Sequence, residues 1–273
     1  MTLNAFFQEC EMKSSHLFRE FIWILTEKFK LNEAGIISGL QELEEVHIKS
    51  LQEWIEKKAA DYPLQYFIGS TDFMDLGLVV HDGVLIPRGE TEEIGYWVLE
   101  KIKNKNIKKM MDIGTGSGCL GIGVACKLQS LELLTLIEPF GDDSLERNID
   151  LHCKDKKFET QYFNQTFENF KFETTYDLIL SNPPYIRHGD PDVANGVYEY
   201  EPHEALYGGD LGWEKEIAWA ERSFEFLNPG GLMVFEISHD QRKILEEKLE
   251  RFGPRIHKDQ FGKDRFFSIE KGL

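Results

Sequence analysis

The sequence has 273 residues, 41% of them hydrophobic and 12% aromatic, which is enough for one enzyme-sized core and a smaller attached module. Its 48 acidic and 31 basic residues give a formal net charge of −17, which disfavours nucleic acid as the main partner because phosphates attract basic surfaces. The sequence has no apolar run of membrane-spanning length, no signal-peptide pattern and no paired motif among its four cysteines, so we expect a cytoplasmic protein without a membrane partner.

The first 62 residues predict a small helical domain, because apolar residues recur there at helical spacing. The recurring positions are Leu17, Phe18, Phe21, Ile22 and Leu25, followed by Leu40, Leu43, Val46, Leu51, Trp54 and Ile55. Residues 63–90 predict a β-hairpin linker, with strands over 73–80 and 83–87 joined through His81-Asp82-Gly83.

Residues 91–273 alternate between strand-like apolar runs and amphipathic helical stretches. The runs cover 107–113, 118–128, 133–138, 143–152, 176–181, 213–227, 231–237, 241–252 and 265–270. Strands separated by single helices indicate an α/β fold with a mainly parallel, doubly wound, Rossmann-like sheet. Ligands of such sheets bind at the carboxyl ends of the strands, so residues just after strands are the candidates for function.

The first candidate is the glycine-rich turn Asp112-Ile113-Gly114-Thr115-Gly116-Ser117-Gly118, placed where a strand leads into a helix. Glycines there permit a tight turn and a close approach of the backbone to a ligand. Dinucleotide and phosphate sites use similar turns, but Asp112 would repel a pyrophosphate and attract a cationic aminoacyl sulfonium group. The turn therefore favours S-adenosyl-L-methionine over ATP or NAD.

The second candidate is Glu138, which ends the next strand. An acidic residue at this place in nucleotide-binding sheets accepts hydrogen bonds from ribose hydroxyls. A lone glutamate in a loop is otherwise commonly solvated. Its spacing from the glycine turn favours the functional interpretation.

The third candidate is the turn Asn182-Pro183-Pro184-Tyr185 after the apolar strand 176–181. The two prolines restrict the backbone and present the Asn182 side chain and the Pro183 carbonyl as two acceptors for one NH2 group. Two such acceptors orient a planar amide or amine nitrogen for methyl transfer, and Tyr185 offers an aromatic face. A structural Asn-Pro turn is the alternative.

These motifs together resemble the release factor glutamine methyltransferases, from about Pro63 to the C-terminus. The distinctive segments are Pro63-Leu64-Gln65-Tyr66-Phe67-Ile68-Gly69, Leu85-Ile86-Pro87-Arg88-Gly89-Glu90-Thr91-Glu92, the glycine turn, Asn182-Pro183-Pro184-Tyr185, Glu201-Pro202 through Ala205-Leu206, and Gly262-Lys263-Asp264-Arg265. The chain departs from the family pattern at Gly89 in place of proline, at Glu138 in place of aspartate, and in the looser turn Pro139-Phe140-Gly141.

The resemblance implies cofactor contacts from the glycine turn and Glu138, and adenine stacking by Phe167, for which a core position is the alternative. It implies that Asn182, Pro183, Pro184 and Tyr185 bind the glutamine of a Gly-Gly-Gln loop in peptide chain release factors, giving N5-methylglutamine. Arg88, Glu90 and Thr91 lie near the site in such proteins, either touching the ligand or bracing the hairpin.

Three alternatives keep this fold: glutamine methylation of a ribosomal protein, adenine methylation of nucleic acid, and a catalytically silent binding module. The acidic chain, without a lysine- or arginine-rich segment at the site, favours a protein over a polyanion as substrate. The spacing of His188, His203, His239 and His257 matches no metal site, and no nucleophile is paired with a base, so we predict neither a metal nor a covalent intermediate.

Overall fold

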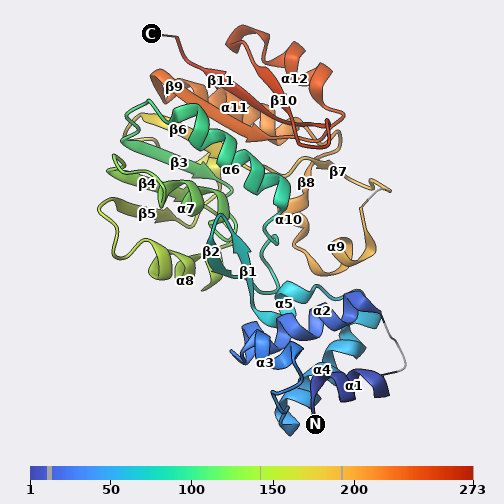
Figure 1. The fold of residues 1–273 in the computed structure, drawn as a ribbon. Helices are drawn as coiled ribbons and strands as arrows, with labels where there is room; N and C mark the ends of the chain where they lie inside the picture. Colours follow the sequence, from blue (N-terminus) through green and yellow to red (C-terminus); the bar gives the residue numbers. More distant parts are fainter. Residues whose placement is uncertain (11–13, 142, 192, 273) are drawn as a thin grey trace.

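The computed structural model describes residues 1–10, 14–141, 143–191 and 193–272. Figure 1 shows a helical N-terminal part, in blue, below a larger part built around a sheet. Helix α5 (Leu64–Ile68) and the hairpin of β1 (Ser70–Phe73) and β2 (Leu76–Val79) lie between the two.

The N-terminal part encloses a core of its own. Its elements are α1 (Leu3–Glu9), α2 (Ser15–Trp23), the π-helical turn η1 (Ile24–Lys28), α3 (Glu33–Ile37) and α4 (Glu45–Ala59). Thr2, Ser14 and Asn32 begin three of these helices, because each side chain accepts a hydrogen bond from a first-turn backbone N–H. Apolar side chains from all of these elements pack together, with Phe21 and Trp54 among the largest.

Two residues of the predicted apolar stripe lie outside this core. Leu40 is 85% exposed in the turn after α3, and Val46 is 54% exposed on the outer side of α4. The helical spacing does not continue across Leu40, because the chain is not helical between Ile37 and Glu45, and Val46 lies in the first turn of α4 on its outer side.

The larger part is built on a seven-stranded sheet with the order β10-β11-β9-β6-β3-β4-β5. The strands are β3 (Lys109–Ile113), β4 (Leu133–Ile137), β5 (Glu159–Phe163), β6 (Tyr176–Ser181), β9 (Leu227–Glu236), β10 (Arg255–Lys258) and β11 (Asp264–Glu270). The first five of these pair in parallel, and β11 and β10 continue the sheet in antiparallel fashion. This arrangement confirms the predicted doubly wound α/β fold.

Helices cover both faces of this sheet. They are α6 (Gly89–Ile102), α7 (Cys119–Ala125) and α8 (Asp143–His152) on one face, and α11 (Glu214–Glu225) and α12 (Arg242–Lys248) on the other. Successive strand residues serve opposite faces: Leu178 and Leu180 pack with the first group of helices and Ile179 with the second. Strands buried on both faces explain the continuous apolar runs in the sequence.

The segment between β6 and α11 crosses the carboxyl edge of the sheet. It contains β7 (Ile186–Arg187), α9 (Asn195–Tyr200), α10 (His203–Leu206) and β8 (Tyr207–Gly209). Two short 3-10 turns complete the described elements, η2 (Phe167–Asn169) and η3 (Glu250–Phe252).

The predicted position of the hairpin is wrong. Its turn is Met74-Asp75, with φ of 49° and 65°, whereas residues 80–88, all described, form no strand. The Asp-Gly pair at 82–83 is typical of hairpin turns, which is why the local pattern points there. The turn at Met74 is instead stabilised by α6, because the Met74 N–H donates to Glu92 Oε1 at 2.6 Å and the Met74 side chain is buried.

The sequence pattern also misses α6, β5 and β10. Burial in β5 does not alternate clearly, because most of its residues are half-buried at the edge of the sheet. Helix α6 begins at Gly89, inside the segment predicted as linker.

Glu20 provides a test of the N-terminal core. Its buried carboxylate accepts from Trp54 Nε1 at 2.9 Å and Lys58 Nζ at 2.7 Å. We expect Glu20→Ala to lower the free energy of unfolding by about 1–3 kcal/mol, because the Trp54 N–H loses its buried partner. Denaturant unfolding measures this, with the exposed Glu53→Ala on α4 as control; equal stability of the two variants would contradict the prediction.

Candidate active site

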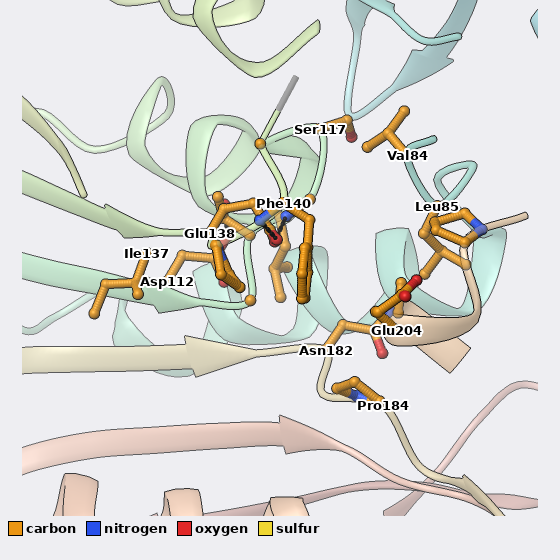
Figure 2. Close-up of a pocket in the computed structure, with 18 of the residues that line it drawn as sticks. Val84, Leu85, Asp112, Ser117, Ile137, Glu138, Phe140, Asn182, Pro184 and Glu204 are labelled. Atoms are coloured by element: carbon orange, nitrogen blue, oxygen red, sulfur yellow. Dashed lines mark hydrogen bonds between the residues drawn. The ribbon is translucent and has the colours of Figure 1, made fainter. Parts of the chain in front are cut away.

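A cavity of about 370 Å³ lies at the carboxyl ends of β3, β4 and β6, where the sheet reverses its direction of growth. Figure 2 shows Asp112, Ile137 and Glu138 on one side of it and Asn182 and Pro184 on another. Its volume falls in the range of small-molecule sites.

The cavity brings together most of the residues predicted from the sequence. Those lining it are Asp112, Gly114, Thr115, Gly116, Ser117, Glu138, Phe167, Asn182 and Pro184. Gly118, Pro183 and Tyr185 are not among the described residues that line it. Tyr185 borders a separate groove.

The glycine turn has the backbone conformation expected for close approach. Gly114, Gly116 and Gly118 have φ of 64°, 54° and 84°, a region that disfavours side chains. A Cβ on Gly114 would also lie 3.1 Å from the ring of Trp219, which lines the cavity from α11. Trp219 cannot be recognised as a cavity residue from the sequence, because nothing local distinguishes it from a core tryptophan in an amphipathic helix.

Asp112 shapes the turn from within. Its Oδ2 accepts from Thr115 Oγ1 at 2.5 Å and from the Gly121 N–H at 2.9 Å. Burial raises the pKa of this carboxyl to about 7, although both hydrogen bonds oppose the shift. A carboxyl that lines the cavity can thus change its charge near neutral pH.

Glu138 connects β4 to the glycine turn. Its Oε2 accepts from the Gly116 N–H at 2.9 Å, and its Oε1 accepts from the Phe140 N–H at 3.0 Å. Each carboxylate oxygen can accept a second hydrogen bond, so ribose hydroxyls remain compatible with this arrangement. Phe140, which is 60% exposed on the cavity wall, follows β4 in a loop and carries no sequence mark of a ligand contact.

Phe167 is both a core residue and part of the cavity wall. It is 1% exposed and meets Trp219 edge-on, with ring centroids 5.7 Å apart. The Arg222 guanidinium lies over the Phe167 ring, 4.9 Å from its centroid. A core position and a contact with adenine, the two alternatives for Phe167, therefore do not exclude each other. Adenine stacking stays a prediction.

The Asn182–Tyr185 turn is held by contacts from three directions. Asn182 Nδ2 donates to Thr91 Oγ1 at 3.2 Å, and the Tyr185 hydroxyl donates to Glu236 Oε1 at 3.0 Å. Gln241 Nε2 donates to the Tyr185 carbonyl at 3.0 Å. These partners come from α6, the end of β9 and the residue before α12, so the turn is braced on several sides in the folded chain.

The segment that contains Gly208 and Gly212 packs closely against this turn. A Cβ atom on Gly208 would collide with the carbonyl oxygen of Pro184. A Cβ atom on Gly212 would lie 2.8 Å from the carbonyl oxygen of Tyr185. The absence of side chains at these two glycines allows the segment after α10 to pack directly on the turn.

Arg88 braces the linker against the segment that follows α9. Its Nη2 donates to Glu201 Oε1 at 2.5 Å, and the Ile86 N–H donates to the other oxygen of that buried carboxylate at 3.3 Å. Arg88 also lines the cavity, so bracing and ligand contact are compatible.

Thr91 and Glu90 occupy the first turn of α6 but differ in their access to the cavity. Thr91 lines the cavity and binds both Asn182 and Glu236. Glu90 is half-buried, and it is not among the described residues that line the cavity. Thr91 is therefore the member of this pair that connects the linker to the site.

The described residues contain no candidate metal site and no candidate membrane-spanning helix. Within 1–10, 14–141, 143–191 and 193–272, no group of three or more His, Cys, Asp or Glu side chains is placed to hold a metal ion. No helix in the same ranges combines the length and apolar character that crossing a membrane requires.

Known proteins resemble this chain in both sequence and fold. Residues 90–200 match the family described as "Methyltransferase small domain". The release factor glutamine methyltransferase of Clostridium botulinum is 36% identical over 222 residues, covering 80% of this chain and 78% of that protein. The release factor glutamine methyltransferase of Flavobacterium psychrophilum is 31% identical over 283 residues, covering 98% and 94%.

Solved structures with the same fold are more distant in sequence. A 16S rRNA N2 methyltransferase from T. thermophilus, in complex with AdoMet and guanosine, aligns with a TM-score of 0.52 at 18% identity. The alignment covers 74% of this chain and 49% of that chain. A ribosomal protein L11 methylase from Lactobacillus delbrueckii subsp. bulgaricus gives a TM-score of 0.50 at 17% identity, covering 71% and 84%.

The pKa of Asp112 yields a test of the expected cofactor. At a pH below its pKa of about 7 this carboxyl is mostly neutral, and at a higher pH the carboxylate attracts a cation. We therefore expect the affinity for S-adenosyl-L-methionine to rise between about pH 6 and pH 8 and to lose this dependence in Asp112→Asn. Calorimetric titration measures it, with the exposed Asp155→Asn as control. A wild-type affinity that is constant over this range would contradict the role given to Asp112.

Proposed function

The chain belongs to the release factor glutamine methyltransferase family, and from this membership we propose that it methylates the glutamine of the Gly-Gly-Gln loop in peptide chain release factors. The methyl donor is S-adenosyl-L-methionine and the product residue is N5-methylglutamine. The observation that carries the proposal is the Asn182 side chain, which lines the cavity while its NH2 group is bound to Thr91. The Asn182 Oδ1 atom is then the end of the amide left to act as an acceptor.

The cavity residues suit the cofactor in charge and shape. Glu138 would accept from the ribose hydroxyls, the backbone of the glycine turn would border the methionine portion, and Asp112 would face its positive charge. Phe140, Phe167 and Trp219 would supply the apolar surroundings of the adenine. S-adenosyl-L-methionine supplies a methyl group activated by a positively charged sulfur.

The Asn182–Tyr185 turn would orient the acceptor amide. Asn182 Oδ1 and the Pro183 carbonyl accept hydrogen bonds from the glutamine NH2, which turns its nitrogen lone pair toward the methyl group. S-adenosyl-L-methionine would supply the methyl group: the new N–C bond would replace its C–S bond, whose electron pair would stay with sulfur. The nitrogen then releases one proton to water, leaving N5-methylglutamine and S-adenosylhomocysteine.

We propose that residues 1–62 hold the release factor while its loop enters the cavity. The helical part is anchored close to the cavity-bordering segment, since the Tyr200 hydroxyl donates to the Ala60 carbonyl at 2.9 Å and the rings of Tyr62 and Tyr200 lie 5.1 Å apart. The net charge of −17 supports a protein partner over DNA or RNA. Because release factors act on ribosomes, we place the reaction in the cytoplasm.

Transfer of labelled methyl to a release factor tests this function. We expect labelling of the Gly-Gly-Gln peptide, no labelling when its glutamine is replaced by alanine, and none on DNA or RNA. Mass spectrometry of the labelled peptide identifies the modified atom. Robust labelling of nucleic acid with none on the release factor would overturn the proposal, and labelling of a ribosomal protein alone would move it to that substrate.

Asn182→Ala tests the acceptor role within the same assay. We expect the variant to lose about 2–4 kcal/mol of transition-state stabilisation, the scale of one lost oxyanion-hole group, while it keeps its affinity for S-adenosylhomocysteine. The exposed Asn104→Ala serves as control. Wild-type turnover in Asn182→Ala would mean that the turn is only structural.

A further inference from the structure

Glu236, at the end of β9, is a buried carboxylate that joins two residues of the acceptor site. It is 1% exposed, and its two oxygens have different partners. Oε2 accepts from Thr91 Oγ1 at 2.6 Å, and Oε1 accepts from the Tyr185 hydroxyl at 3.0 Å. One side chain therefore links α6, β9 and the turn after β6.

The charge of Glu236 determines the direction of the hydrogen bonds that follow. An ionised carboxylate only accepts, so the single proton of the Thr91 hydroxyl must point at Glu236. The Thr91 oxygen is then left as an acceptor, and Asn182 must present its NH2 group to it, as the 3.2 Å contact has it. The Asn182 Oδ1 atom is the end of the amide that remains for the cavity.

We infer that Thr91 and Glu236 are positioning residues, which hold the Asn182 amide in the one orientation that accepts hydrogen bonds from the methyl acceptor. The inference rests on the proposed function, because the acceptor is the glutamine amide assigned above. Without the Thr91 hydroxyl, or with a neutral group at position 236, the Asn182 amide can rotate and present a donor. A donor facing an NH2 group repels it.

Several charged and titratable groups act on the state of Glu236. Burial raises its pKa, while the hydroxyls of Thr91 and Tyr185 and the nearby Arg265 on β11 favour the ionised form. Glu90 on α6 opposes ionisation. Because the pKa is raised, a falling pH protonates Glu236 earlier than an ordinary glutamate, and the protonated form can donate to Thr91. At low pH the Asn182 amide then loses the orientation in which its Oδ1 atom accepts hydrogen bonds, and kcat falls.

The space around the Thr91 side chain is limited. Its side chain is buried, with 1% exposure, between the carboxylate and the amide. Valine has nearly the same shape without a donor or acceptor, and serine keeps the hydroxyl without the methyl. The two variants therefore separate the hydrogen bonds from the volume of the side chain.

Thr91→Val, Thr91→Ser and Glu236→Gln test the inference on the full chain with a release factor as substrate. We expect Thr91→Val to lower kcat by about 10²-fold, the effect of a misplaced reacting group, with unchanged KM for the release factor and unchanged Kd for S-adenosylhomocysteine. Thr91→Ser should retain most of kcat. Glu236→Gln should lower kcat and should lose the acidic limb of the wild-type pH profile, measured at saturating cofactor.

Each measurement has an outcome that overturns the inference. Wild-type kcat in Thr91→Val would show that the hydroxyl orients nothing, and a larger loss of kcat in Thr91→Ser than in Thr91→Val would assign the effect to packing. Thermal melting with S-adenosylhomocysteine verifies that each variant is folded. If Thr91→Val is unstable, Glu236→Gln decides, since an unaltered kcat and acidic limb there would equally overturn the inference.

The same series distinguishes failure of the inference from failure of the proposed function. A wild-type chain that binds S-adenosylhomocysteine but labels no release factor defeats the proposed function. A wild-type chain that labels the release factor, with Thr91→Val labelling it at the same rate, defeats only the positioning role.

Discussion

The parallel pairing of β3 with both β4 and β6 is the constraint on which the site depends. The chain adds β4 and β5 on one side of β3 and then crosses over to add β6 on the other. The carboxyl ends of three strands therefore meet at one edge, and a crevice opens where the direction changes. Asp112, Glu138 and Asn182, far apart in the sequence, line one cavity for this reason.

Three carboxylates give this edge its shape: Asp112 and Glu236 are buried, and Glu138 is half-buried. Asp112 binds the turn that follows β3, Glu138 binds that turn from β4, and Glu236 binds α6 and the Tyr185 hydroxyl from β9. A buried carboxylate is stable only when hydrogen bonds replace its lost water. The two buried groups, Asp112 and Glu236, therefore impose an orientation on their donors, and burial raises the pKa values of both.

One buried side chain ties the linker to the glycine turn. Asn148 on α8 accepts from the Val79 N–H at 2.8 Å and donates to the carbonyls of Val79 and Ser117 at 3.0 and 2.9 Å. The hairpin and the glycine turn thus share a partner. The Arg88–Glu201 ion pair adds a second connection, between the linker and the segment that follows α9. The linker is therefore attached to the site by oriented polar contacts.

The sequence alone determined the α/β class, the glycine turn, Glu138 and the Asn182–Tyr185 turn, because periodicity and turn chemistry are local properties of the chain. Only the tertiary structure placed the hairpin turn at Met74, since the contact that stabilises it comes from Glu92 on α6. It alone also revealed Trp219 and the link from Glu236 through Thr91 to Asn182. The Asn182–Thr91 and Thr91–Glu236 hydrogen bonds join residues that are 91 and 145 positions apart in the sequence. Such bonds leave no local pattern, because they exist only after the sheet has brought its strand ends together.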